Sequence, residues 1–306
     1  MSGQPWFDDL PVLGELPLQL AAAKLRELGE DQAADALATA TEEEATPTLY
    51  PGWWPFQDRP WQHTAHAIGH LASSPRGDDA IPVRDASAID PDLSLKGARL
   101  KLTLGRLYVA DYPGRGTHRV LVDVAARDQT APAGEQLHFA ATYQVRDGEA
   151  AGVAAYPIFL GLPVSGEGLV LGLVTVNVGN EADERFLATL ESDTFKAGLR
   201  LARAWQPALA PLSELVLGLT KAIAGRARNV AIQKFTVGLD FRASPGGLRL
   251  ATGMYIAVQI PEELVLWDWD EWVYHPRRGR LVSSADPAQP IPFNYVMVGV
   301  DRYDGE

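Results

Sequence analysis

The chain has 306 residues, and its 27 basic and 39 acidic side chains give a formal net charge of −12. That charge argues against a nucleic-acid partner and against binding to an anionic membrane. The absence of cysteine excludes disulfides, thiol nucleophiles and cysteine-bound zinc, and it fits a reducing compartment. No apolar run approaches the roughly 20 residues that span a bilayer, and residues 1–9 lack the basic and apolar parts of a signal peptide. We therefore expect a soluble, acidic, cytoplasmic protein without a transmembrane segment.

The first 92 residues predict a helical and aromatic segment ahead of the main domain at residues 93–306. Residues 17–40 carry two short apolar stripes at helical spacing, with Gly29 where a glycine commonly ends a helix. A stretch rich in proline and tryptophan follows, and its rings either cover the next domain or anchor a partner protein. These tryptophans are Trp53, Trp54 and Trp61. Residues 73–92 are rich in Pro, Gly, Ser and Asp and predict a linker.

Residues 62–71 predict a helix that carries three of the six histidines of the chain. On a helix, His63, His66 and His70 would lie within about 60° of one face. His66 and His70, four residues apart, would then be spaced to chelate one metal ion, as in a metal-dependent enzyme. The Glu that follows the first ligand in His-Glu-x-x-His metalloproteases is replaced by Ala67, and no third ligand is evident. A packed face of histidines is the alternative interpretation.

From residue 97 the pattern changes to the alternation of apolar and polar residues that is typical of strands. The alternation over residues 100–109 changes phase at Gly105, where a β-bulge would fit. It returns over residues 120–124 and 137–145. Residues 169–178 are apolar on both faces and predict a central, covered strand. Short strands separated by Gly and Pro turns indicate an antiparallel sandwich or barrel.

A two-helix insertion at residues 181–228 interrupts the strands. Apolar residues fall on one helical face over 186–205 and again over 211–223, so we expect both helices to cover a face or an edge of the sheet. The first helix is too acidic to lie on a membrane surface, and peripheral membrane contact is not expected.

The strand pattern resumes on both sides of the turn sequence at residues 244–247. This predicts a β-hairpin in which residues 235–241 pair with residues 248–254. We expect residues 97–178 and 230–300 to form one antiparallel domain. In it, Val237→Asp should unfold the chain, because a buried carboxylate without a partner is costly.

An acidic and aromatic run follows this region. Trp267-Asp268-Trp269-Asp270 resembles the third calcium loop of C2 domains, in which a strand ends in an aromatic-Asp-aromatic-Asp sequence. The resemblance implies a C2-like sandwich in which Asp268 and Asp270 bind Ca²⁺, with Asp111 as a further ligand. It covers these four residues and a rough strand order. The Ser-Asp-Pro-Tyr stretch of that family is missing, and the helical insertion is foreign to it. The alternative is a tryptophan-rich edge whose aspartates pair with nearby arginines.

The chain contains no hydrolase elbow, phosphate-binding loop or dinucleotide-binding motif. Most tryptophans lie outside the alternating strands, where they pack onto their own domain or anchor a partner. We therefore predict a mainly β protein, an antiparallel sandwich with helical decorations, that acts as a non-catalytic protein-interaction or assembly module. Its partner is another protein, and we expect Trp53, Trp54, Trp61 and Trp272 to contact it. The alternatives are a calcium-dependent C2-like domain and a metal-dependent enzyme that uses His66 and His70; no other cofactor is implied.

Overall fold

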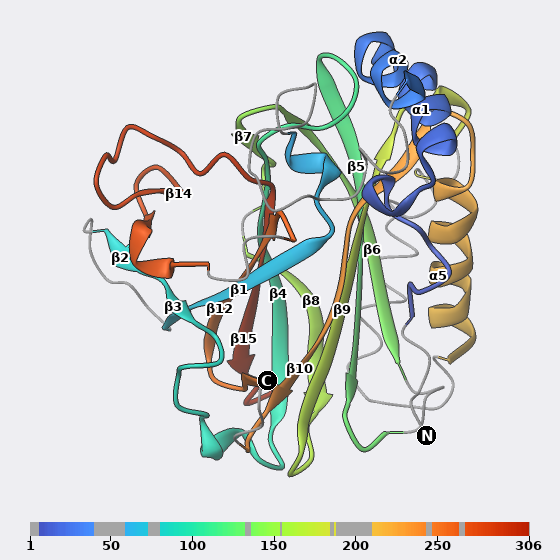
Figure 1. Ribbon diagram of the computed structural model, residues 1–306. Helices are drawn as coiled ribbons and strands as arrows, with labels where there is room; N and C mark the ends of the chain where they lie inside the picture. The colour runs from blue at the N-terminus through green and yellow to red at the C-terminus, as the bar shows by residue number, and fades with distance from the viewer. Residues whose placement is uncertain are drawn as a thin grey trace.

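The computed structural model describes residues 6–39, 59–72, 80–131, 136–153, 155–183, 187, 210–242, 247–262 and 267–305 (Figure 1). Two large β-sheets stack face to face, one long helix lies along the outer side of one sheet, and a small third sheet lies beyond the other (Figure 1). The molecule is thus mainly β with antiparallel sheets, as the sequence predicts. No helix among these residues has the length and apolar character needed to cross a membrane.

Among the described residues, sheet A has five strands and sheet B has seven. In spatial order, sheet A consists of β11 (Leu248–Arg249), β10 (Asn229–Asp240), β9 (Gly168–Val178), β5 (Thr117–Asp128) and β6 (Leu137–Arg146). Sheet B consists of β3 (Arg84–Asp85), β1 (Ala65–Ala72), β12 (Gly253–Ile260), β15 (Tyr295–Arg302) and β4 (Arg99–Val109), and both β7 (Glu149–Ala150) and β8 (Tyr156–Pro163) pair with β4. Sheet C consists of β14 (Arg280–Ser283), β13 (Trp272–His275) and β2 (Ile81–Pro82).

The helices lie at the periphery of the sandwich. They are α1 (Leu18–Glu27), α2 (Asp31–Thr39) and α5 (Ala210–Ala224), with short 3-10 turns η1 (Leu13–Glu15), η2 (Pro60–Gln62), η3 (Leu93–Leu95), η4 (Glu181–Asp183) and η6 (Trp269–Glu271). Gly29, between α1 and α2, has a φ of 82°, the conformation expected of a glycine that ends a helix. The predicted helix pair near the N-terminus is confirmed.

Three apolar layers hold these elements together. Leucines and valines that alternate inward from sheets A and B form the central layer. On the outer side of sheet A, Val216 and Ile223 of α5 pack with Trp6 and Phe7 of the N-terminal segment. On the outer side of sheet B, apolar residues of the sheet pack against sheet C and Trp269. At about 25 cal/mol per Å² of buried apolar area, these layers supply the main force for folding.

Several strand predictions are confirmed in detail. β9 lies between β5 and β10 and is buried along almost its whole length. The β4–β15 ladder pairs Met297 with Arg106 and Val298 with Leu104, so Gly105 is the extra residue of a bulge. A single residue that shifts the phase of alternation in the sequence therefore marks a real irregularity of the sheet.

The predicted helix at residues 62–71 is wrong, because this segment forms strand β1. β1 pairs with β12 over eight residues, from Ala65 opposite Ile260 to Ala72 opposite Gly253. A Cβ placed on Gly69 would lie 2.5 Å from Val83 and 2.8 Å from the Trp269 ring, so the strand is packed closely. A full ladder with β12 overrides the helical spacing of the histidines. Residues on both sides of Asp92 therefore contribute to sheet B.

The predicted hairpin is also wrong. β10 belongs to sheet A, whereas β12 belongs to sheet B, so the chain crosses from one sheet to the other. The short strand β11 between them runs parallel to β10, with Leu239 opposite Leu248. Alternation on both sides of a turn shows that two strands face one core, but it does not show that they pair. Residues 97–178 and 230–300 nevertheless share both sheets, as predicted.

The second helix of the predicted insertion is confirmed as α5. It packs on the outer face of sheet A. The first predicted helix, at residues 186–205, lies outside the described residues except for Leu187, which is buried.

Candidate interaction site

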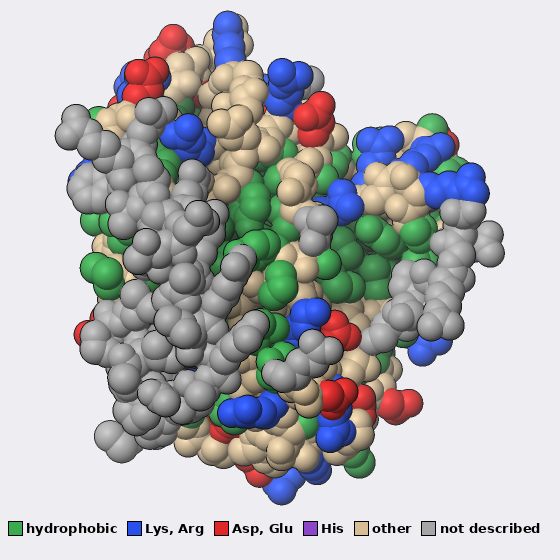
Figure 2. Space-filling model, turned by 180° about the vertical axis from the view of Figure 1, so that it is seen from behind, with side chains coloured by type: hydrophobic (Ala, Val, Ile, Leu, Met, Phe, Trp, Pro, Cys, Tyr) green, Lys and Arg blue, Asp and Glu red, His purple; other side chains and the backbone are tan. Residues whose placement is uncertain are grey.

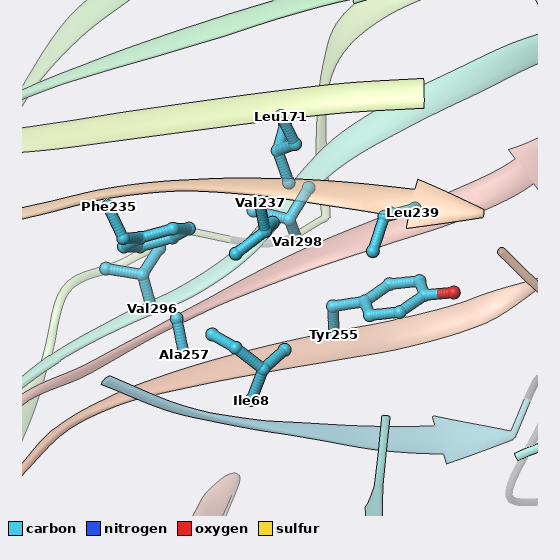
Figure 3. Close-up of a pocket in the computed structure, with 9 residues that line it drawn as sticks. All are labelled: Ile68, Leu171, Phe235, Val237, Leu239, Tyr255, Ala257, Val296 and Val298. Carbon is cyan, nitrogen blue, oxygen red and sulfur yellow. The ribbon is translucent and has the colours of Figure 1, made fainter. Parts of the chain in front are cut away.

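The sandwich has an apolar opening along the side where β10 of sheet A faces β1 and β12 of sheet B. We call this opening the seam; it is a shallow depression with room for about one water molecule. Figure 3 shows its apolar side chains converging from both sheets. They are Ile68, Leu171, Phe235, Val237, Leu239, Tyr255, Ala257, Val296 and Val298.

The outer residues of the seam face the interior of the sandwich but are only partly buried. Phe235, Val237 and Ile68 have this intermediate exposure, whereas Leu239, deeper along the same strand, is completely buried. Val237, which the sequence places in the core, thus lies at an opening. Partly exposed apolar side chains that gather at one place on a folded protein commonly mark a site of association. Figure 2 views the molecule from behind, where hydrophobic side chains also lie in the middle of the face, between charged residues above and below.

The strand beside the seam has an unpaired edge. β10 pairs with β9 along its length, but on its other edge β11 covers only Leu239 and Asp240. Nearer the start of the strand, Val12 forms an isolated bridge with Ala231. Within the described part of the chain, residues 234–238 therefore have no strand partner on this edge.

His66 of β1 lies at the mouth of the seam. Its ring centroid is 5.1 Å from that of Phe235, and its Nε2 is buried without a hydrogen-bond partner. Burial lowers the pKa of His66 to about 4, so the imidazole is neutral at physiological pH. His66 therefore adds an uncharged, largely apolar surface to the seam.

The strand conformation separates the two histidines of the metal hypothesis. Four residues of strand place His66 and His70 roughly 13 Å apart, whereas one turn of helix would have brought them together. His70 instead packs on Tyr255, at 5.0 Å between ring centroids, with its Nε2 3.2 Å from the carbonyl oxygen of Thr252. In the described ranges, no group of three or more His, Asp or Glu residues could hold a metal ion.

Two of the three aspartates of the calcium hypothesis, Asp268 and Asp111, have hydrogen-bond partners for their carboxylates. Asp268 accepts a hydrogen bond from the backbone N–H of Asp270 at 2.9 Å and thereby caps the turn η6. The two residues lie on this turn and not on a strand. Arg59 donates to both carboxylate oxygens of Asp111, at 3.1 and 3.2 Å. Burial nevertheless raises the pKa of Asp111. Calcium binding by these residues stays a prediction.

The predicted partner-binding tryptophans fall in different places. Trp53 and Trp54 lie outside the described residues. Trp61 is 3% exposed, so its ring packs on its own domain. Trp272 is partly exposed and stacks on Trp267, with 6.0 Å between ring centroids and 10° between planes.

Trp272 belongs to an aromatic cluster on the outer side of sheet B. The cluster consists of Trp267, Trp269, Trp272 and Phe293; the ring centroid of Trp267 is 5.5 Å from that of Trp269 and 5.7 Å from that of Phe293. The ring of His63 lies 6.0 Å from that of Phe293, whereas His66, three residues later, contacts Phe235 between the two sheets. The cluster and the seam are therefore separate apolar surfaces. Sequence reasoning found the tryptophans but missed the seam, because it depends on which strands stand at sheet edges.

The chain matches no family model, no curated protein and no solved structure. Its function is therefore inferred from its own residues.

Proposed function

We propose that this protein is a non-catalytic interaction module that binds a segment of another protein in the seam. The observation that supports this proposal is the partial exposure of Phe235, Val237 and Ile68, three apolar side chains directed toward the inside of the sandwich. Their exposure costs hydrophobic stabilisation in the isolated chain, and a partner that covers them recovers it.

The chemistry of the seam favours binding over catalysis. All of its lining side chains are apolar except for the phenol of Tyr255, whose hydroxyl is already bonded to the backbone of Arg249 and Ala251. Burial raises the pKa of this hydroxyl. A general base or nucleophile needs a titratable group directed at the substrate. Among the described residues that line the seam only Tyr255 carries one, and the imidazole of His66 at the mouth packs on the Phe235 ring.

Photo-crosslinking tests the proposal directly. A photoreactive phenylalanine analogue at position 237 should form an adduct of defined mass with a partner protein in the native source. The same analogue at Leu20, an exposed residue of α1, should not. If the two positions give the same adducts, contact at the seam is not specific.

A second variant shows whether the apolar surface provides the binding energy. Phe235→Ala should abolish the adduct formed from position 237, because truncating a true anchor costs about 2 kcal/mol or more of binding. Thr236→Ala, on the opposite face of the same strand, should leave the adduct unchanged. Melting temperatures of both variants separate lost binding from lost folding. An adduct that survives Phe235→Ala contradicts the proposal.

A further inference from the structure

We infer that the seam binds its partner by strand addition: an extended segment of another protein pairs with the unpaired edge of β10 and becomes an additional strand of sheet A. This inference rests on the proposed function and specifies how the same site binds. It follows from the direction of the backbone groups, the position of the apolar side chains and the charge of the chain.

The backbone of β10 presents hydrogen-bonding groups along its unpaired edge. The carbonyl of Asp240 accepts from the N–H of Leu250 at 2.9 Å, on the side of β11. Because the groups of a strand alternate in direction, those of Lys234, Thr236 and Gly238 point to that same side, away from β9. Residues 234–238 span about 17 Å of strand. This edge therefore offers a row of donors and acceptors that an extended backbone can satisfy.

Among the described residues, η1 and the residues before it reach this edge only as far as Lys234, and residues 235–238 lack the features that usually prevent such pairing. Edge strands are commonly protected by proline, by free lysines or by a covering element. β10 contains no proline. Its Lys234 is bonded to Glu15 at 2.7 Å and is held at the end of the segment.

The side chains beside the edge define the partner sequence. A strand added to β10 directs every second side chain to the side of the seam, where Phe235 and Val237 of β10 and Ile68 of β1 are partly exposed. These positions of the partner should carry apolar residues. His66 is neutral there, since burial lowers its pKa, so no charge within the seam favours an ionic side chain.

Charge favours a different protein over a second copy of this chain. The net charge of −12 makes two copies repel each other. The same charge attracts a basic segment and does not repel a neutral one. The occupant that fits is an extended segment of another protein with alternating apolar residues and no net negative charge.

A synthetic peptide tests strand addition on the full chain. The probe is an acetylated and amidated Lys-Val-Thr-Val-Thr-Val-Thr-Lys peptide, whose valines alternate and whose lysines match the charge of the protein. Titration should show saturable binding in the micromolar to millimolar range. Thr236→Ala should bind within twofold of the unsubstituted chain. Thr236→Pro removes the N–H that points to the unpaired edge, and it should weaken binding at least tenfold.

Amide hydrogen exchange supplies a readout that needs no substitution. Saturation with the peptide should slow exchange of the Thr236 and Gly238 amides. The Phe235 amide, which points to β9, serves as the internal reference. If Thr236→Pro fails to fold, this measurement decides alone.

The outcomes separate the inference from the proposed function. Equal affinity of Thr236→Pro and Thr236→Ala, or no protection of the two amides, overturns strand addition. If Phe235→Ala still abolishes the partner adduct in that case, the seam remains a docking site that binds in another way. No peptide binding at millimolar concentration together with no specific adduct overturns both. A dimer of the unliganded chain that Thr236→Pro dissociates identifies a second copy as the occupant and overturns the assignment to another protein.

Discussion

At the scale of single residues, the polar groups next to the apolar surfaces respond to pH in a predictable way. Burial against Phe235 lowers the pKa of His66 to about 4 from an ordinary value of 6.5. Between these two values the unfolded chain binds a proton that the folded chain does not. The free energy of unfolding therefore falls as the pH drops through this range, by up to about 2 kcal/mol at pH 5 from this residue.

The variant His66→Phe should remove this contribution. It keeps an aromatic ring beside Phe235 but cannot be protonated. The free energy of unfolding is measured with urea for both proteins at pH 7.5 and pH 5.0. Because the two proteins share all other titratable groups, the contributions of those groups cancel to first order in the comparison. The unsubstituted protein should lose more stability than the variant between these pH values. Equal losses would show that His66 is charged or solvated in the folded state.

Glycine positions allow a second prediction at this scale. Gly168 begins β9 with a φ of 133°, and a Cβ there would lie 2.1 Å from the carbonyl oxygen of Leu239 on β10. Gly168→Ala should therefore lower the free energy of unfolding by of order 1–3 kcal/mol. Gly166, two residues earlier, has open space around the Cβ position, so Gly166→Ala is the matched control. Equal denaturation midpoints for the two variants would contradict the close packing at Gly168.

At the scale of elements, the sequence predicted what depends on local chemistry. The helix pair at the N-terminus, the bulge at Gly105 and the covered strand β9 follow from glycine conformation and from alternation along one segment. These three features depend on residues that are close in the sequence, so they can be predicted without knowing which distant strand pairs with which.

The errors concern pairing between distant segments. The residue spacing in β1 indicates a helix, because the sequence does not show that β12 pairs with this segment. The alternation of β10 and β12 is the same whether the two strands pair or face each other across a core. The candidate site was missed for the same reason. Phe235 and Val237 are ordinary core positions in the sequence, and they are partly exposed only because β10 stands near the edge of sheet A.

At the scale of the whole molecule, distant parts of the chain are interleaved in both large sheets. β1, β12, β15 and β4 lie side by side in sheet B, while β10 lies next to β9 in sheet A. One apolar layer contains inward-facing side chains of both sheets, such as Leu104 and Leu173, which are completely buried. Neither sheet can keep this layer if the other unfolds.

The described sandwich should therefore unfold in one cooperative transition, although the chain is long enough for two domains. Leu104→Ala in sheet B and Leu173→Ala in sheet A should each cost about 2–5 kcal/mol. Both variants should lower the midpoint of one and the same unfolding transition by similar amounts. The result should not depend on whether unfolding is followed by calorimetry, far-UV circular dichroism or tryptophan fluorescence. Trp6 reports on the outer side of sheet A, Trp61 on the central layer and Trp269 on the outer side of sheet B. Two resolved transitions, each moved by only one of the variants, would show that the sheets are separate folding units and that the seam is a boundary between them.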